Sequence, residues 1–92
     1  MLELKDLRFF VAVYEEGSFT KAASRLTTVQ SAVSDRIRRL ERDLGAPLFL
    51  RYHRAITPTQ KGKLLHDHAK RVLVQVGDLE MAIRAEKRRK SA

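Results

Sequence analysis

The strongest constraint on this chain is a run of apolar residues in its C-terminal third. They recur at alternating intervals of four and three, the spacing of a helix that pairs with another helix: Leu65, Ala69, Val72, Val76, Leu79 and Ile83. No proline interrupts residues 59–88, so we expect one helix about 45 Å long that Thr59 caps. A chain of 92 residues is too small to cover such a helix by itself. The six residues therefore predict a homodimer interface, with a higher oligomer as an alternative in an intact protein.

A first helix is expected over residues 4–15, because apolar side chains there recur three or four positions apart. Phe9 and Val13 lie on a second face of the same helix, and a helix that is apolar on two faces is usually buried on both. Gly17 follows at the position where a left-handed residue ends a helix. We therefore expect this helix to be buried on two sides, with its outer apolar residues against the partner chain.

A second, short helix is expected over residues 18–26. Ser18 or Thr20 can cap it, since a hydroxyl oxygen accepts a hydrogen bond from an N–H group of the first turn. Its inward positions include the small residues Ala22 and Ala23, which let another helix cross at close range.

The third helix is expected over residues 29–44, where apolar residues again recur at intervals of three and four: Val33, Ile37, Leu40 and Leu44. Thr27 and Thr28 supply the preceding turn and the cap. Gly45 ends the helix, and Pro47 prevents its resumption. Two short helices joined by a tight turn form a helix-turn-helix.

The stretch between the two prolines of the chain favours strands over a helix. Leu48–Arg51 and Arg54–Thr57 are short β-capable runs, separated by Tyr52 and His53. We expect them to form a two-stranded wing.

These elements predict a mostly α fold class. We expect residues 1–58 to form a winged helix-turn-helix of three helices and a two-stranded wing, an arrangement typical of a DNA-binding domain. Residues 59–92 form a linker and dimerisation helix with a basic C-terminal end. The basic run 87–90 could be a nucleic-acid tail, but a solvated helix end is the simpler interpretation.

The predicted exposed side of the third helix carries residues that can contact the edges of DNA bases. Gln can bond adenine in a bidentate manner, Arg can bond guanine, and Ser adapts to several bases. The positions opposite the apolar face are Gln30, Ser31, Ser34, Asp35 and Arg38. The N-terminal end of such a helix is the part that enters the major groove. From this pattern alone, an ordinary solvated helix face is an equally good interpretation.

The distribution of charge favours a polyanionic partner. The net charge is +8, and its excess is uneven along the chain. Residues 1–28 hold four basic and four acidic side chains, residues 29–63 hold eight and three, and residues 64–92 hold seven and four. A localised basic region on a small domain is typical of nucleic-acid binding. A basic helix on a membrane surface is an alternative, but the C-terminal segment lacks the Trp and Phe that this needs.

Several motifs, all in register, resemble the N-terminal region of LysR-type transcriptional regulators. The opening match is residues 7–26, LRFFVAVYEEGSFTKAASRL. Shorter matches follow in the same order: VQSAVS at 29–34, IRRLE at 37–41, LGAPLF at 44–49 and TPTQKG at 57–62. The similarity covers about residues 4–85, so it is far more specific than any single motif.

The resemblance implies a bacterial DNA-binding homodimer, in which two antiparallel long helices space two recognition helices across a palindromic site. Matching positions imply base contacts by Gln30, Ser31 and Ser34. With the rest of the exposed face, the expected base-edge set is Gln30, Ser31, Ser34, Asp35 and Arg38. The expected phosphate and minor-groove set is Ser18, Thr20, Thr28, Arg51, His53 and Arg54.

Three features depart from the family pattern. Many relatives have Pro where Ser31 stands, and many have Arg or another donor where Asp35 stands. Asp35 could accept a hydrogen bond from cytosine N4 or form a helical ion pair with Arg39, and we favour the ion pair. Relatives also continue into an effector-binding domain, so we expect this chain to be a fragment or a natural short form. Any small-molecule effector would then act through the domain that is absent here.

No enzyme activity, cofactor, catalytic residue or metal site is expected. The four glycines are too scattered for a phosphate-binding loop, and there is no cysteine for a thiolate site. His66 and His68 point in different directions on a helix, so they are poor co-ligands and are expected on its surface.

The main alternative from another class is a helical dimerisation adaptor whose basic face meets an acidic protein or RNA. The wing and the Gln and Ser side chains of the third helix favour double-stranded DNA instead. The longest apolar stretch, Leu7–Tyr14, contains Arg8 and is too short for a bilayer, and the first residues lack a signal-peptide pattern. We therefore expect no membrane partner and a cytoplasmic location, on the nucleoid.

Overall fold

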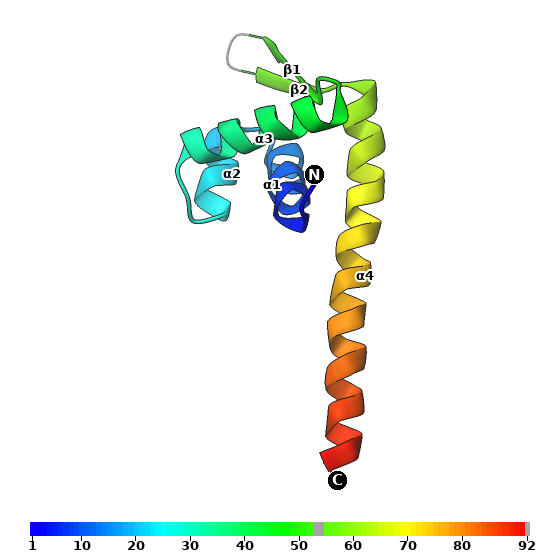
Figure 1. The fold of residues 1–92 in the computed structure, drawn as a ribbon. Helices are drawn as coiled ribbons and strands as arrows, with labels where there is room; N and C mark the ends of the chain where they lie inside the picture. The colour runs from blue at the N-terminus through cyan, green and yellow to red at the C-terminus, as the bar shows by residue number, and fades with distance from the viewer. Residues whose placement is uncertain (53–54, 92) are drawn as a thin grey trace.

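The computed structural model describes residues 1–52 and 55–91. Its elements are α1 (Leu4–Glu16), α2 (Phe19–Arg25), α3 (Gln30–Leu44), β1 (Phe49–Tyr52), β2 (Ala55–Pro58) and α4 (Gln60–Ser91). In Figure 1 the first five elements gather into a small head, and α4 leaves this head and extends far beyond it. The principal extents are 58 × 25 × 20 Å, so the molecule is elongated along this helix. The predicted winged helix-turn-helix with a long final helix is confirmed.

The helix α1 lies at the centre of the head and packs against α2, α3 and α4. Both of its predicted apolar faces pack into the head: Phe10 and Val13 are fully covered, whereas Phe9 and Tyr14 are half-buried. Gly17 ends the helix in the left-handed region at φ 64°, as expected, and its N–H group donates to the Val13 carbonyl oxygen at 2.9 Å. Leu4 differs from the expectation, because it precedes the covered turns and stays exposed.

The starts of α2 and α3 are capped in different ways. Ser18 caps α2 as predicted, since its Oγ accepts from the Lys21 N–H group at 3.1 Å. The predicted cap of α3 is wrong: Val29 takes the extended cap conformation, without a side-chain hydrogen bond. The reason is that the Thr28 N–H group donates to the Ala23 carbonyl oxygen at 2.9 Å, which places Thr28 in the turn itself.

Three of the four apolar residues predicted for the inward face of α3 are buried. Val33, Ile37 and Leu40 are fully buried in the core of the head. Leu44 was expected to join them, but 43% of it is exposed, because α3 ends there at the left-handed Gly45.

The wing is an antiparallel pair whose register runs from Phe49 opposite Pro58 to Tyr52 opposite Ala55. The strand β1 begins one residue later than predicted, and Arg54, the predicted start of the second strand, lies outside the described residues. The backbone of Leu48 is bonded elsewhere: its N–H group donates to Glu41 Oε2 at 2.7 Å, and its carbonyl oxygen accepts from Thr59 at 2.9 Å. These two bonds tie the base of the wing to the end of α3 and the start of α4.

Aromatic rings fix the wing to the head. The Phe49 ring lies 5.3 Å from the ring centroid of Phe10 and 6.2 Å from that of Phe19. Phe49 is buried, so the first residue of β1 belongs to the core even though the wing is mostly exposed.

The start of α4 is held close to the wing. Thr59 caps the helix as predicted, because its Oγ1 accepts from the Gly62 N–H group at 3.0 Å and donates to the Pro47 carbonyl oxygen at 2.8 Å. A Cβ atom at Gly62 would overlap the Leu48 carbonyl oxygen, so only glycine permits this approach. Within the described part of the chain, no helix is both long and apolar enough to cross a bilayer.

A buried ion pair that sequence patterns do not indicate joins α1 to α3. Asp6 Oδ1 lies 2.7 Å from Arg36 Nη1, with 4% of the Asp6 side chain and 18% of the Arg36 side chain exposed. Asp6 Oδ2 also accepts from the Glu3 N–H group at 2.8 Å. Burial by itself would raise the pKa of Asp6. The Glu3 backbone bond, the Arg36 hydrogen bond and the charges of Arg36 and Arg39 outweigh it, so the pKa lies below its ordinary value of 3.8.

We expect Asp6→Ala to lower the free energy of unfolding by about 2–3 kcal/mol near neutral pH, because Arg36 loses its carboxylate. Since the pKa of Asp6 is depressed in the folded state, its contribution is complete above pH 3.8 and is lost as pH falls through the folded pKa. Urea denaturation near neutral and near acidic pH, at one protein concentration, measures both effects. Asp43→Ala, which removes an exposed carboxylate from α3, is the control. An equal loss at both pH values would contradict the assignment to the ion pair.

Candidate nucleic-acid interface

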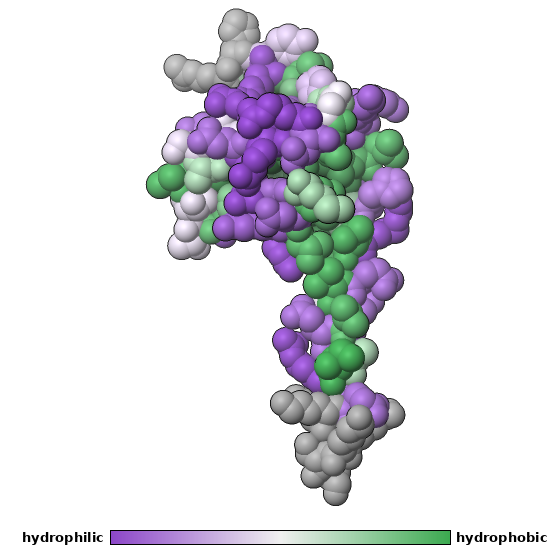
Figure 2. All heavy atoms as spheres, viewed as in Figure 1, coloured by the Kyte–Doolittle hydropathy of each residue, from purple (hydrophilic) through white to green (hydrophobic). Residues whose placement is uncertain are grey.

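The exposed face of α3 is a continuous polar surface. Gln30 and Ser31 are exposed at its first turn, and Asp35 and Arg38 follow on the outer side. Figure 2 shows hydrophilic side chains gathered over α3 on the face toward the viewer. The helix-turn-helix therefore presents its second helix outward, with donors and acceptors near the helix start.

Ser34 does not belong to this exposed face. Only 7% of it is exposed, which contradicts its predicted position opposite the apolar residues. Ser34 directly follows the buried Val33 and lies three positions before the buried Ile37, so it borders the inward side of the helix. The outward row instead runs Ser31, Asp35, Arg38 and Arg42, at intervals of four, three and four.

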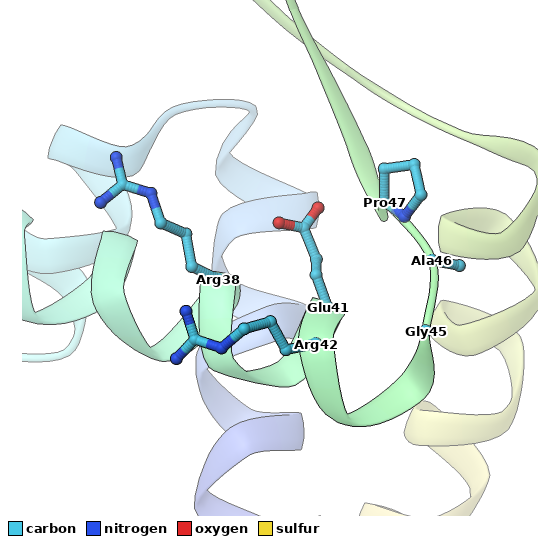
Figure 3. A pocket seen from close by; sticks show the side chains of 6 residues that line it. All are labelled: Arg38, Glu41, Arg42, Gly45, Ala46 and Pro47. Carbon is cyan, nitrogen blue, oxygen red and sulfur yellow. The ribbon is translucent and has the colours of Figure 1, made fainter.

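Arg42 is the member of this row that the sequence analysis missed, although the same spacing could have found it. Figure 3 shows Arg38 and Arg42 extending from α3 toward the same side, while Glu41 turns toward the wing. Together with Gly45, Ala46 and Pro47, these three residues line an open hollow of about 520 Å³. Two adjacent guanidinium groups at its edge can donate to phosphate oxygens or to guanine.

Asp35 pairs with a different arginine from the one expected. Its Oδ1 lies 3.6 Å from Nη1 of Arg38, three residues on, whereas Arg39 was predicted as the partner. Side-chain exposure of 76% for Asp35 and 58% for Arg38 makes this a weak, solvated pair. The carboxylate thus lies beside a candidate base-reading arginine and partly offsets its charge.

The candidate phosphate contacts surround this face. Thr20 is exposed, and Ser18 and Thr28 are half-buried. Ser18 Oγ already accepts the cap hydrogen bond, which leaves its hydroxyl hydrogen available to donate. On the wing, the guanidinium carbon of the exposed Arg51 lies 4.5 Å from the Phe19 ring centroid. His53 and Arg54 lie outside the described residues.

The six apolar residues of α4 that predict a dimer interface, here called the seam, do not form one continuous exposed surface: Leu65, Ala69, Val72, Val76, Leu79 and Ile83. Ala69 is 1% exposed because it packs into the core of its own chain, so it is not open to a partner, contrary to the prediction. Leu65 is half-buried against the same core. Farther along the helix, Val72, Leu79 and Ile83 are 40%, 61% and 63% exposed. Figure 2 shows the apolar surface continuing down α4 beyond the head.

His66 is also placed differently from the expectation. Its ring stacks on Tyr14 with centroids 3.7 Å apart and planes 6° from parallel, so it is half-buried between α1 and α4 instead of on the surface. His68 is exposed, as expected. The stack is a further link between the head and the long helix.

Comparison with known proteins identifies the family of this domain. Residues 4–63 match the family model of the bacterial regulatory helix-turn-helix proteins of the lysR family. The chain belongs to the LysR family. The match spans α1 through the first turn of α4, so it includes every element that positions the exposed face of α3.

Curated LysR-type relatives are transcriptional regulators and are much longer than this chain. The uncharacterized regulator YusT of Bacillus subtilis is 46% identical over 82 residues, which are 89% of this chain and 28% of YusT. The regulator AbaB of Streptomyces antibioticus is 52% identical over 68 residues, which are 74% of this chain and 23% of AbaB. The chain therefore spans about a quarter of the length of these relatives.

Solved LysR-family structures share the whole fold. The CbnR DNA-binding domain in complex with DNA superposes with a TM-score of 0.89 at 35% identity, covering 92% of this chain and 98% of that one. The BenM DNA-binding domain with catB site 1 DNA gives 0.88 at 38% identity, covering 91% and 93%. The chain is thus a LysR-type winged helix-turn-helix DNA-binding domain followed by a long helix.

Proposed function

We propose that this chain binds double-stranded DNA sequence-specifically, as the DNA-reading part of a bacterial transcriptional regulator. The α3 helix enters the major groove, and the wing lies near the minor groove. The observation that carries this proposal is the outward polar row of α3, presented by a fold that superposes closely on two domains solved on DNA. The regulator would work in the cytoplasm, at the nucleoid.

The proposed base contacts come from the accessible part of the predicted set. Gln30, Ser31, Asp35 and Arg38 are exposed, whereas Ser34 is too buried to be the main contact. Arg42 continues this row along α3, and its guanidinium group is a proposed phosphate contact. The hydroxyl groups of Ser18, Thr20 and Thr28, with Arg51, His53 and Arg54 of the wing, remain the proposed phosphate and minor-groove set.

We further propose a homodimer on a palindromic site, with residues 1–58 as the binding domain and residues 59–92 as the dimerisation helix. The seam is symmetric about residue 74: Leu65 and Ile83 are equidistant from it, and so are Val72 and Val76. Two antiparallel copies therefore set Val72 opposite Val76 and Leu65 opposite Ile83, whereas the remaining pair would set Leu79 opposite Ala69, which the head already covers. A two-fold dimer places two α3 helices on two half-sites of opposite orientation.

Selection of bound sequences from a random duplex pool tests this function. We expect a palindromic consensus, and complexes that survive an excess of non-specific duplex. A generic polyanion binder or an RNA-binding adaptor would yield no consensus and would be stripped by the same competitor. A shift of RNA alone would overturn the proposal.

Asp35→Ala separates two roles for this carboxylate. We expect tighter non-specific binding and an unchanged consensus, because removing the weak Arg38 pair adds net positive charge to the interface. If Asp35 instead reads cytosine N4, the variant loses a cytosine preference worth about 1–3 kcal/mol at one position of each half-site. Parallel selections with the wild type and Asp35→Ala measure this. Asp43→Ala controls for the loss of one charge from α3.

A further inference from the structure

A glutamate lies among the basic side chains of the exposed face of α3. Glu41 lines the same open hollow as Arg38 and Arg42, and Figure 3 shows its side chain turned toward the wing. A carboxylate near phosphate groups is repelled by them and weakens binding to DNA. Glu41 is therefore an unfavourable residue for this surface unless it has a second role.

The carboxylate is bonded to the segment that leads into the wing. Glu41 Oε2 accepts from the Leu48 N–H group at 2.7 Å, across the end of α3 and the turn that follows it. Leu48 is 1% exposed and lies directly before β1. A buried N–H group that loses its acceptor stays unpaired, because water cannot reach it. The Glu41 side chain thus links α3 directly to the base of the wing.

Packing leaves two sides of this segment open. Ala46 and Pro47 line the open hollow of about 520 Å³ beside the outward row of α3. Ala46 and Leu48 line a second, apolar hollow of about 260 Å³, which opens beside Leu44 where the end of α3 meets the start of α4. Hydrogen bonds therefore contribute more to the placement of this segment than they would in a filled core.

The other contacts of the segment lead to other helices. The Leu48 carbonyl oxygen accepts from the Thr59 N–H group at 2.9 Å, and Thr59 Oγ1 donates to the Pro47 carbonyl oxygen at 2.8 Å. Phe49 packs on aromatic rings of α1 and α2. These contacts fix the wing to α1, α2 and α4, whereas the Glu41 bond fixes it to the helix that is proposed to enter the major groove.

We propose that Glu41 is a positioning residue for DNA binding, which holds the wing at a fixed place relative to α3. The inference rests on the proposed function, in which α3 enters the major groove and the wing lies near the minor groove. Arg51 lies three residues after Leu48 on β1, so a shift of Leu48 moves this guanidinium group relative to α3. Placing both contacts before binding lowers the entropy that is lost on binding.

Glu41→Gln and Glu41→Ala separate this role from the charge. Gln keeps an oxygen that can accept from the Leu48 N–H group but carries no charge, whereas Ala removes both. On a site selected from the random duplex pool, Glu41→Gln should bind at least as tightly as the wild type. Glu41→Ala should bind about tenfold more weakly, although it too removes a negative charge. Asp43→Asn and Asp43→Ala, at an exposed carboxylate of α3, are matched controls and should bind alike.

Arg51→Gln, added to each Glu41 background, shows whether the effect passes through the wing. We expect Arg51→Gln to weaken binding equally in the wild type and in Glu41→Gln, and less in Glu41→Ala, where the wing is no longer held in place. A merely structural loss at Glu41 would leave the effect of Arg51→Gln the same in every background.

Residual dipolar couplings of the backbone N–H groups measure the orientation of β1 and β2 relative to α3 in the absence of DNA. We expect the wild-type orientation in Glu41→Gln, and a changed or averaged orientation in Glu41→Ala with faster hydrogen exchange at the Leu48 N–H group. If circular dichroism shows that Glu41→Ala does not fold, Glu41→Asp takes its place, because its carboxylate is one methylene shorter and keeps the charge.

The outcomes separate the placement of the wing from the proposed function. An unchanged orientation of the wing in Glu41→Ala would overturn the placement by Glu41. Equal weakening by Glu41→Gln and Glu41→Ala, a changed orientation with unchanged affinity, or the same effect of Arg51→Gln in every background would overturn its role in DNA binding. A wild-type chain that selects no consensus would overturn the proposed function and this role with it, and the dipolar couplings would distinguish that failure from a failure of the Glu41 bond.

Discussion

Replacing Val72 and Val76 together with lysine is expected to give a folded monomer. In the antiparallel pairing each of these residues faces the other residue of the partner, so the double change sets ammonium groups opposite one another in two central layers. Neither side chain is needed for the core of the head, since Val72 is 40% exposed and Val76 lies outside the buried cluster. Analytical ultracentrifugation measures the change in mass.

The same variant should bind a palindromic site about 10²–10⁴-fold more weakly than the wild type, because the two heads no longer act as one bivalent ligand. Its affinity for a single half-site should change little. Val74→Lys is the matched control: it adds the same charge at a residue that is 60% exposed and lies on another side of α4. A double variant that remains dimeric would show that another surface holds the dimer.

The second large effect expected is a steep dependence of DNA affinity on salt. If the dimer makes about 6–10 phosphate contacts, affinity should fall by about 10³–10⁵ between roughly 50 and 200 mM salt. The basic side chains that support this expectation lie on α3 and the wing, where Arg38, Arg42 and Arg51 are exposed. Fluorescence anisotropy on a selected duplex at several salt concentrations gives the slope.

Arg51→Gln tests one of these contacts. If Arg51 binds phosphate, the variant should weaken binding to all sequences alike and reduce the salt slope by about one for each protomer. Arg71→Gln is the control, because Arg71 is equally basic but lies on α4 and pairs with Asp67 at 3.2 Å. An effect confined to sites flanked by A·T pairs would indicate readout of a narrow minor groove instead. No change in slope would remove Arg51 from the interface.

The Val72 and Val76 variant tests only the part of the seam that lies beyond the head. The other part, near Ala69, is packed against the core of its own chain. The stretch near Ala69 helps to hold α4 to its own head, and the stretch from Val72 to Ile83 is open to a partner. The His66 stack on Tyr14 and the close approach of Gly62 to Leu48 also hold the first part of α4 against the head. A substitution where α4 packs on the head should therefore lower the free energy of unfolding. A substitution between Val72 and Ile83 should instead weaken dimerisation.

Local patterns in the sequence were sufficient for the order of the helices, for the ends of α1 and α3 at glycine and for the presence of the wing, but not for the cap of α3 or the first residue of β1. The three-and-four spacing of Val33, Ile37 and Leu40 predicts a helix and its inward face, because helical periodicity is a property of neighbouring residues. Gly17 and Gly45 mark helix ends for an equally local reason, the left-handed conformation that glycine adopts readily. The same kind of pattern could have located Arg42 in the outward row of α3.

What only the tertiary structure decided are the contacts between residues that are far apart in the chain. Periodicity tells which side of a helix is apolar but not how far a neighbouring element wraps around it, so Ser34 and Ala69 are buried where exposure was expected. The pairing of Asp6 with Arg36 depends on how α1 crosses α3, and no local spacing encodes that crossing. The hollow beside Leu44 likewise exists only because α4 starts against the end of α3, where two helix ends leave apolar surface that neither can cover alone.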